Sequence, residues 1–173
     1  VDQLFVAAFV VAIEGPPVNK IKATFRSIAL LCTAGIALFA ANAHADIVIP
    51  TGGTMALNGA IVDLACSDVS VAGSLSLDSG QLINVRNLSI GAGGTINAGT
   101  GSITLSGNWT NNGAFVPSTG KVRFVDAASC SPSSVITGNT SFYDLSIVST
   151  SGKLYQFGAG NTQTVVQSLT ITG

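Results

Sequence analysis

The stretch GSLSLDSGQLINVRNLSIGAGGTINAG, residues 73–99, shows the pattern that decides the fold. Leucine, isoleucine and valine alternate in it with serine, asparagine and threonine, and glycine interrupts the alternation every few residues. Its only charged residues are Asp78 and Arg86. Alternation with a period of two is typical of strands with one buried face, and glycine clusters mark the turns between strands. The stretch therefore predicts several short strands joined by tight corners.

The alternating segments repeat along the chain at a period of about 20 residues. One series of apolar residues has steps of 20, 21 and 19 residues: Met55, Leu75, Ile96 and Phe115. Two further series have steps of 21, 20 and 19 residues: Val62, Ile83, Ile103 and Val122, and Leu64, Val85, Leu105 and Phe124. A fourth series has two steps of 19 residues: Val71, Ile90 and Trp109. Three short strands in each repeat predict a coil with three sides.

A single coil of this kind cannot bury its apolar face, so the coils must stack on one another. Stacking places each strand about 4.8 Å from its equivalent in the next coil, and the sequence therefore predicts an all-β, parallel β-solenoid. At about 20 residues a coil, residues 46–173 would form about six coils. A β-sandwich also has alternating strands, but its strand spacing would not keep three parallel series in register.

The first 45 residues differ in composition from the rest of the chain. Residues 18–45, VNKIKATFRSIALLCTAGIALFAANAHA, contain three basic residues, then the apolar run 28–41, and end in Ala-His-Ala. This order is typical of a secretory signal peptide that is cleaved between Ala45 and Asp46. The sequence therefore predicts export of a mature chain that begins at Asp46.

The length of the apolar run and the position of residues 1–17 bear on this interpretation. A transmembrane anchor needs roughly 20 apolar residues, whereas the run 28–41 is shorter and contains Gly35. No stable transmembrane anchor is therefore expected in the chain. Residues 1–17 precede the basic region with which a signal peptide normally begins, so we expect them to come from an over-extended gene start, with translation beginning at Val18.

We expect intact-mass measurement of the exported protein to give the mass of a chain that begins at Asp46. The reason is that the basic, apolar and Ala-x-Ala regions follow one another in the order that signal peptidase requires. A mature protein that kept Lys20 or the apolar run would contradict the predicted cleavage.

The regularity of the repeat changes along the mature chain. Residues 46–125 are predicted to form regular solenoid coils, and residues 126–140 an inserted loop. Residues 141–173 are predicted to form further, longer coils, because Leu145 and Leu169 are 24 residues apart. The chain stops directly after a predicted strand, and an open coil end is an edge that proteins usually cover. We therefore expect a longer parent protein or a truncated sequence. Open solenoid ends would also allow self-association.

Two cysteines, Cys66 and Cys130, remain after the predicted cleavage. Disulfides form and persist in the compartments to which a signal peptide leads. We therefore expect these two residues to pair; the alternative is two separate buried thiols.

The charge and residue content exclude several classes of function. The chain has seven Lys or Arg residues against eight Asp or Glu residues and contains no basic block, so it lacks the patch that nucleic-acid binding requires. Its only histidine, His44, and its only glutamate, Glu14, precede the predicted mature chain. The mature chain can therefore form neither a Ser-His-Asp triad nor a histidine metal site, and no catalytic residue, metal or cofactor is predicted.

Aspartates are the remaining candidates for catalysis. Asp63 and Asp68 lie on the same predicted coil with a corner between them. Some β-helix enzymes cleave polysaccharides with paired carboxylates, one acting as acid and the other as base or nucleophile. A carbohydrate-active β-helix, of the lyase or hydrolase type, is therefore the alternative to a non-catalytic function.

Two segments show the Gly-punctuated alternation most clearly: NLSIGAGGTINAGTGSITLSGNWTNNGAFVPSTGKVRF, residues 87–124, and ITGNTSFYDLSI, residues 136–147. These coils resemble the stalk repeats of large secreted bacterial surface proteins. Such segments are similar to the β-helices of filamentous haemagglutinins and autotransporter passengers. The resemblance implies display on the outer surface of a Gram-negative-type bacterium or release from it, with the periplasm as the other location, and adhesion or matrix building as the role.

The outward residues of the coils suggest how such a module would act. Rows such as Ser70, Ser89 and Asn108, or Ser76 and Asn97, are short, neutral and polar. Side chains of this kind suit many weak hydrogen bonds to glycans or to other surface proteins. The sequence therefore predicts a structural or adhesive solenoid that presents a surface and performs no catalysis.

Overall fold

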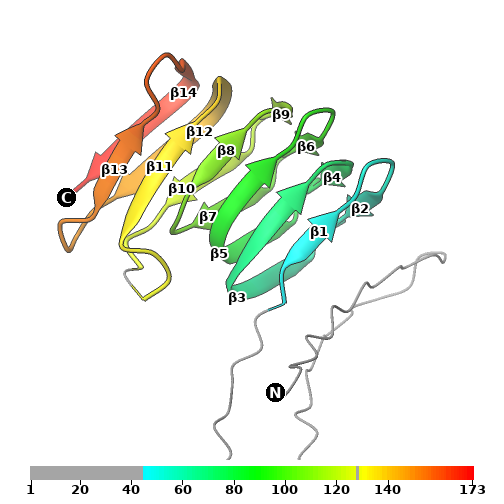
Figure 1. Cartoon of the computed structure of the whole chain (residues 1–173), viewed down its shortest axis with the longest axis horizontal. Coiled ribbons are helices and arrows are strands. Elements are labelled where there is room, and N and C mark those ends of the chain that lie inside the picture. Colours follow the sequence, from blue (N-terminus) through cyan, green and yellow to red (C-terminus); the bar gives the residue numbers. More distant parts are fainter. Residues whose placement is uncertain (1–44, 128) are drawn as a thin grey trace, which may run out of the picture. The chain divides into compact units, whose positions relative to one another are not determined.

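The structure is a computed structural model that describes residues 45–127 and 129–173. These residues contain 14 strands and no helix, and they form a parallel β-solenoid of about six turns (Figure 1). The predicted fold class, an all-β parallel solenoid, is confirmed. The predicted gene start at residues 1–17 and all but the last residue of the predicted signal peptide lie outside the described residues. The described part contains no helix long and apolar enough to cross a membrane.

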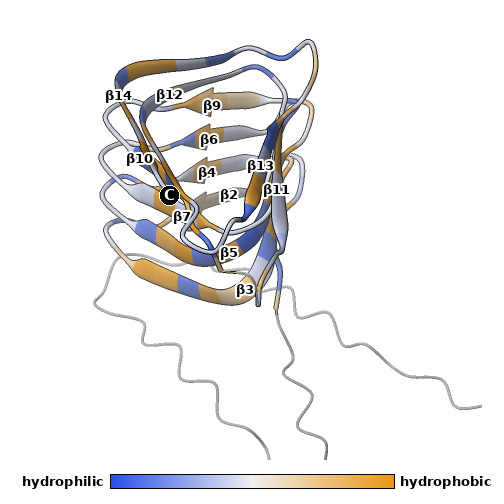
Figure 2. Cartoon of the chain, turned by 90° about the vertical axis from the view of Figure 1, so that its left-hand side faces the viewer, coloured by the Kyte–Doolittle hydropathy of each residue, from blue (hydrophilic) through white to orange (hydrophobic). Residues whose placement is uncertain are grey.

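The strands belong to three series, each of which runs along the solenoid. Face 1 contains four strands of three residues: β2 (Thr54–Ala56), β4 (Ser74–Ser76), β6 (Thr95–Asn97) and β9 (Ala114–Val116). Face 2 contains the first part of β3 (Ile61–Val71) and of β5 (Gln81–Ile90), then β7 (Ser102–Leu105), β10 (Lys121–Phe124), β12 (Thr140–Val148) and β14 (Gln163–Thr172). Face 3 contains β1 (Ile47–Ile49), the second part of β3 and β5, β8 (Trp109–Asn111), β11 (Ser133–Thr137) and β13 (Leu154–Phe157). Figure 2 shows face 1 as one stack and shows β3 and β5 bending around the corner between faces 2 and 3.

The register of face 1 agrees with the predicted repeat. Met55 pairs with Leu75, Leu75 with Ile96, and Ile96 with Phe115. The outward pair of Ser76 and Asn97 is also as predicted. The uninterrupted alternation of these three-residue strands is sufficient to set their register, because one slipped residue would turn every apolar side chain outward.

The register of face 2 differs from the prediction by one residue in β5. Val62 pairs with Leu82, which in turn pairs with Ile103, so Leu82 takes the buried position that was assigned to Ile83. The cause is an extra residue in β5, where Asn84 adopts a φ of 55° and the register shifts between Leu82 and Val85. A β-bulge of this kind adds a residue without changing the alternation on either side of it.

A larger bulge in β3 changes a second predicted pair. Val85 pairs with Ser67 instead of Leu64, because Ala65 and Cys66 both adopt positive φ and the register shifts between Asp63 and Ser67. Beyond the bulge, Val69 pairs with Leu88 and Val71 with Ile90. The bulge therefore places Cys66 at the corner between faces 2 and 3.

The register of face 3 differs from the prediction by two residues in β8. Ile90 pairs with Asn111, whereas Trp109 pairs with Leu88. Asn111 thus occupies an inward position, where its Nδ2 donates to the carbonyl oxygen of Asn139 at 3.0 Å and to Oγ1 of Thr140 at 3.1 Å. Because Asn111 is polar, the apolar pattern of the sequence predicts the nearest apolar residue, Trp109, at this inward position. For the same reason Ser89 pairs with Thr110, and the predicted outward neighbour Asn108 is wrong.

The segment 126–140, predicted to be an inserted loop, contains a strand. β11 pairs with β8 on one side and with β13 on the other, and β12 begins at Thr140. Ser134, an inward residue of β11, is fully buried, and its Oγ donates to the carbonyl oxygen of Ser106 at 3.1 Å. Because this inward residue is polar, the sequence of β11 does not show the alternation of apolar and polar residues that predicts a strand. Beyond it, Leu145 pairs with Leu169, 24 residues away, as predicted.

The apolar core lies inside the coils. Leu75, Leu88, Ile90, Ile96 and similar side chains from all three faces are almost completely buried, and burying each one stabilises the fold by about 1.5–3 kcal/mol. Three aromatic rings pack together inside the coils. The ring centroid of Trp109 lies 5.0 Å from that of Phe115 and 5.3 Å from that of Phe142. Trp109 is therefore a core residue, as predicted, and its Nε1 donates to Oγ1 of Thr140 at 3.1 Å.

The glycines at the corners allow adjacent coils to approach each other closely. A Cβ atom on Gly94 would collide with the carbonyl oxygen of Val71, and one on Gly101 with that of Gly80. Gly94 and Gly101 do not have positive φ, so close backbone approach explains these two glycines. Gly93 and Gly99, in contrast, adopt positive φ of 80° and 56°, a conformation that favours glycine.

A ladder of side chains joins five successive coils at the start of face 3. Oδ1 of each side chain accepts a hydrogen bond from the backbone N–H of the equivalent residue one coil further on, at 2.8–3.1 Å: Asp46 from Asp68, Asp68 from Asn87, Asn87 from Asn108, and Asn108 from Val135. The ladder gives hydrogen-bond partners to backbone amides at the corner between faces 2 and 3. Its first side chain belongs to the residue that would follow the predicted cleavage site.

Apolar side chains are exposed at the end formed by β13 and β14. Phe157, Leu169 and Ile171 occupy inward register positions, yet they are 52%, 55% and 68% exposed. Together with Leu145 and Val165 they line a hollow of about 310 Å³. The last of the described coils therefore exposes side chains whose equivalents in the preceding coil are buried.

Candidate functional site

The two predicted disulfide residues lie together in the structure. Cys66 and Cys130 form a disulfide across a Cα–Cα distance of 5.4 Å and a sequence separation of 64 residues. Cys66 lies in the bulge of β3, and Cys130 lies in the connection between β10 and β11. Because β5 and β7 separate β3 from β10 in the sheet, the bond joins coils that are not neighbours.

Asp68, one of the two candidate catalytic carboxylates, is engaged in structural contacts. Nε and Nη2 of Arg86 donate to its two oxygens at 2.8 and 2.9 Å, and Nδ2 of Asn87 donates to Oδ1 at 3.0 Å. The hydrogen bonds from Arg86 are the main cause that lowers the pKa of Asp68, against the smaller effect of burial. A carboxyl group held ionised in this way is a poor general acid.

Asp63, the second candidate, also accepts hydrogen bonds from its surroundings. Its Oδ1 accepts from the backbone N–H of Ala65 at 3.0 Å and from Nδ2 of Asn84 at 2.9 Å. These contacts hold the two bulges of β3 and β5 together. The geometry assigns Asp63 and Asp68 to the construction of the corner between faces 2 and 3.

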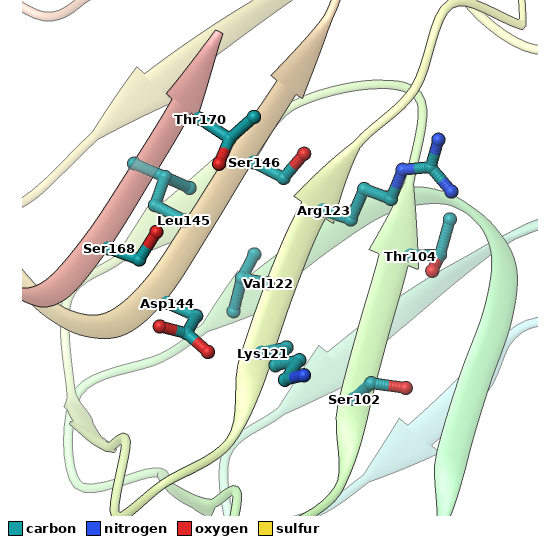
Figure 3. A pocket seen from close by; sticks show the side chains of 10 residues that line it. All are labelled: Ser102, Thr104, Lys121, Val122, Arg123, Asp144, Leu145, Ser146, Ser168 and Thr170. Carbon is teal, nitrogen blue, oxygen red and sulfur yellow. The ribbon is translucent and has the colours of Figure 1, made fainter.

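A different site, a hollow of about 390 Å³, lies on the outer side of face 2 (Figure 3). Four neighbouring strands, β7, β10, β12 and β14, supply its lining. The register arranges the outward side chains in two rows. Row A contains Ser102, Lys121, Asp144 and Ser168. Row B contains Thr104, Arg123, Ser146 and Thr170.

The two cations of the hollow come from one strand. Lys121 and Arg123 alternate along β10 with the buried Val122 and Phe124, so both point outward and both are exposed. Figure 3 shows their side chains extending toward β7, near Ser102 and Thr104, whereas Asp144 lies on the β12 side. The hollow therefore combines two positive charges and the negative charge of Asp144 with hydroxyl groups on neighbouring strands.

The other two cations of the described residues are engaged elsewhere. Arg86 forms an ion pair with Asp68. Lys153 is only 7% exposed, and its Nζ donates to the carbonyl oxygens of Ser106 and, at 3.2 Å, Val125. Burial lowers the pKa of Lys153, while the charge of Asp126 has the opposite effect. Both side chains stabilise the corner between faces 2 and 3.

Tyr155 and Asp126 belong to the same corner as Lys153. The ring centroid of Tyr155 lies 5.4 Å from Nζ of Lys153, and its hydroxyl donates to the carbonyl oxygen of Val148 at 2.6 Å. Burial raises the pKa of Tyr155 to about 12, and the charge of Asp126 adds to this effect. A hydroxyl group that keeps its proton in this way acts as a structural donor here.

Sequence reasoning considered the aspartates and did not identify the two cations of β10 as a site. The signal that could have found them is Lys-Val-Arg-Phe, residues 121–124, in which two cations occupy the outward positions of a strand. The described residues contain no group of three or more His, Cys, Asp or Glu side chains that could hold a metal ion. No protein-family model matches the chain, and neither a curated protein nor a solved structure is significantly similar to it.

Proposed function

We propose that the mature chain is an exported, structural or adhesive β-solenoid, displayed on or released from the surface of a Gram-negative-type bacterium, that binds glycans or other surface proteins without catalysis. The observation that carries the proposal is the outer side of the coils, where hydroxyl and amide side chains recur at every turn. Row B, for example, presents hydroxyl groups on β7, β12 and β14, with Arg123 of β10 between the first two, and neighbouring strands are about 4.8 Å apart.

The geometry of the solenoid supports a role in presenting a surface. Every coil is fastened to the next by parallel strand pairing, and the Asp/Asn ladder and the disulfide add bonds along the stack. A rigid support lets many weak hydrogen bonds act together, because little conformational entropy is lost on binding. The resemblance to bacterial surface stalks agrees with this proposal.

The alternative, a carbohydrate-active β-helix, is supported less well. A glycosidase needs one carboxyl group that keeps a proton and a second carboxylate beside it. Asp68 is held ionised by Arg86, and Asp63 accepts two hydrogen bonds within the bulges. Both candidate aspartates thus have a structural role that accounts for their positions.

Incubating the exported chain with a panel of neutral and acidic polysaccharides tests the proposal. We expect retention of one or more polysaccharides without the appearance of new chain ends, because the outer rows offer hydrogen bonds and no catalytic pair. The measurements are affinity electrophoresis for retention and an assay of reducing and unsaturated ends for cleavage.

Two outcomes would overturn the proposal. One is sustained cleavage that Asp63→Asn or Asp68→Asn abolishes, which would favour the carbohydrate-active alternative. The other is a complete lack of retention on every polysaccharide and on purified cell envelopes. Digestion of intact cells with added protease separates surface display from a periplasmic location, since a periplasmic chain would be protected.

A further inference from the structure

We infer that the hollow on face 2 is a binding site for an anionic polysaccharide, with Arg123 and Lys121 as the residues that recognise its acidic groups. This inference rests on the proposed function and specifies the site and the class of ligand. It starts from the charges of the described residues. The described residues contain four Lys or Arg residues and six aspartates, so their net charge is negative: Asp46, Asp63, Asp68, Asp78, Asp126 and Asp144. Two exposed cations on one strand are therefore a local exception.

The spacing of the two cations suits an extended acidic ligand. Residues i and i+2 of a strand are about 6.6 Å apart, so the side chains of Lys121 and Arg123 can contact one acidic group together or two in succession. Two cations are too few to neutralise the closely spaced phosphates of a nucleic acid. A polysaccharide with isolated acidic groups has a charge density that this pair can match.

Row B provides the rest of the site. Arg123 is flanked in the register by Thr104 on β7 and by Ser146 on β12, and Thr170 of β14 continues the row. All three neighbours are neutral hydroxyl residues, which can donate hydrogen bonds to sugar oxygens and accept them from sugar hydroxyls. A sugar chain that lies along row B, across the strands, could therefore place one acidic group at the guanidinium of Arg123 and its hydroxyl groups at the neighbouring hydroxyl residues.

Row A explains why Arg123 is the main anchor and Lys121 the weaker one. Lys121 pairs in the register with Asp144, whose negative charge partly offsets that of Lys121. Arg123 has no acidic neighbour in its own row. A guanidinium can also bind a carboxylate or sulfate group through two parallel hydrogen bonds, whereas a lysine acts as a point charge.

The test measures binding of the exported chain to a polyuronate, to a sulfated polysaccharide and to a neutral polysaccharide of similar length. Arg123→Ala should weaken binding of the acidic polymers about tenfold, a change that corresponds to about 1.4 kcal/mol, and Lys121→Ala should weaken it less. Asp144→Asn should strengthen it, because it removes the opposing charge. Gln81→Ala is the matched control and should leave binding unchanged, since Gln81 is exposed and pairs with Ser102 but does not line the hollow. The comparison of the two acidic polymers shows whether carboxylate or sulfate is preferred.

The variants change only outward side chains, so the buried residues of β10 and the fold should be unaffected; circular dichroism and thermal midpoints check this. The inference is overturned if Arg123→Ala and the double variant K121A/R123A bind the acidic polymers as the wild type does. It is also overturned if they lose the neutral polymer to the same extent, because that loss would not involve charge. Retention of the neutral polymer alone by the wild type would refute the anionic site and leave the proposed function intact.

Discussion

Replacing Ile90 by aspartate should unfold the solenoid or destabilise it severely. The side chain of Ile90 is completely buried between Val71 and Asn111 of the adjacent coils. An unpaired carboxylate at that position costs several kcal/mol, which is a large share of the roughly 5–15 kcal/mol that stabilises a typical domain. Urea unfolding followed by circular dichroism measures the loss, and Leu88→Asp should behave in the same way because Leu88 is equally buried.

Ser89→Asp is the matched control for this prediction. Ser89 lies between the two core residues on the same strand, and its side chain points outward, beside Ser70 and Thr110. The aspartate would remain hydrated there, so we expect a change of less than about 1 kcal/mol. Equal tolerance of aspartate at positions 88, 89 and 90 would mean that the register of β5 is wrong.

Removing the disulfide should produce the second large effect. In the chain-entropy description, a cross-link that closes a loop of this length stabilises the folded state by about 4 kcal/mol. The variants Cys66→Ser and Cys130→Ser should therefore each lower the free energy of unfolding by an amount of this order. Urea titration of the two variants and of the reduced wild type measures the change.

The double variant Cys66→Ser/Cys130→Ser controls for effects of the serines themselves. It should be no less stable than either single variant, because one bond is lost in all three proteins. Titration of free thiols in the unreduced, folded protein gives an independent result. Two reactive thiols there, or single-variant losses that add up in the double variant, would contradict the disulfide.

The fold could be predicted from the sequence wherever the alternation is uninterrupted, as in face 1. The predicted register was wrong at the bulges. There Asn84, and the pair Ala65 and Cys66, add residues whose backbone leaves the strand conformation, although the spacing of apolar residues in the sequence looks regular. The prediction also failed where an inward residue is polar. Asn111 and Ser134 are buried because other coils satisfy their hydrogen bonds, and those partners are 28 or more residues away in the chain.

The candidate site could be predicted only in part. The pairing of Cys66 with Cys130 follows from their number and the expected compartment, and no geometry was needed. The hollow on face 2 depends on which outward residues of four different coils lie beside one another. The steps from β7 to β10 and from β10 to β12 differ, 19 against 23 residues, because the connection that carries Cys130 intervenes. Repeat spacing alone could therefore not place Asp144 and Ser146 next to Lys121 and Arg123.

The disulfide between Cys66 and Cys130 determines how the solenoid would respond to a force that pulls its two ends apart. A solenoid pulled at its ends loses coils one after another, because each coil contacts only its neighbours. Force that reaches Cys66 passes through the covalent bond directly to Cys130, and the 64-residue separation between them bears no load. At about 3.4 Å a residue, roughly 220 Å of contour length would stay hidden from the pulling force while the bond is intact. Reduction would release that length, so the redox state of the surroundings would set how far the two ends of the solenoid can be drawn apart before the last coil unfolds.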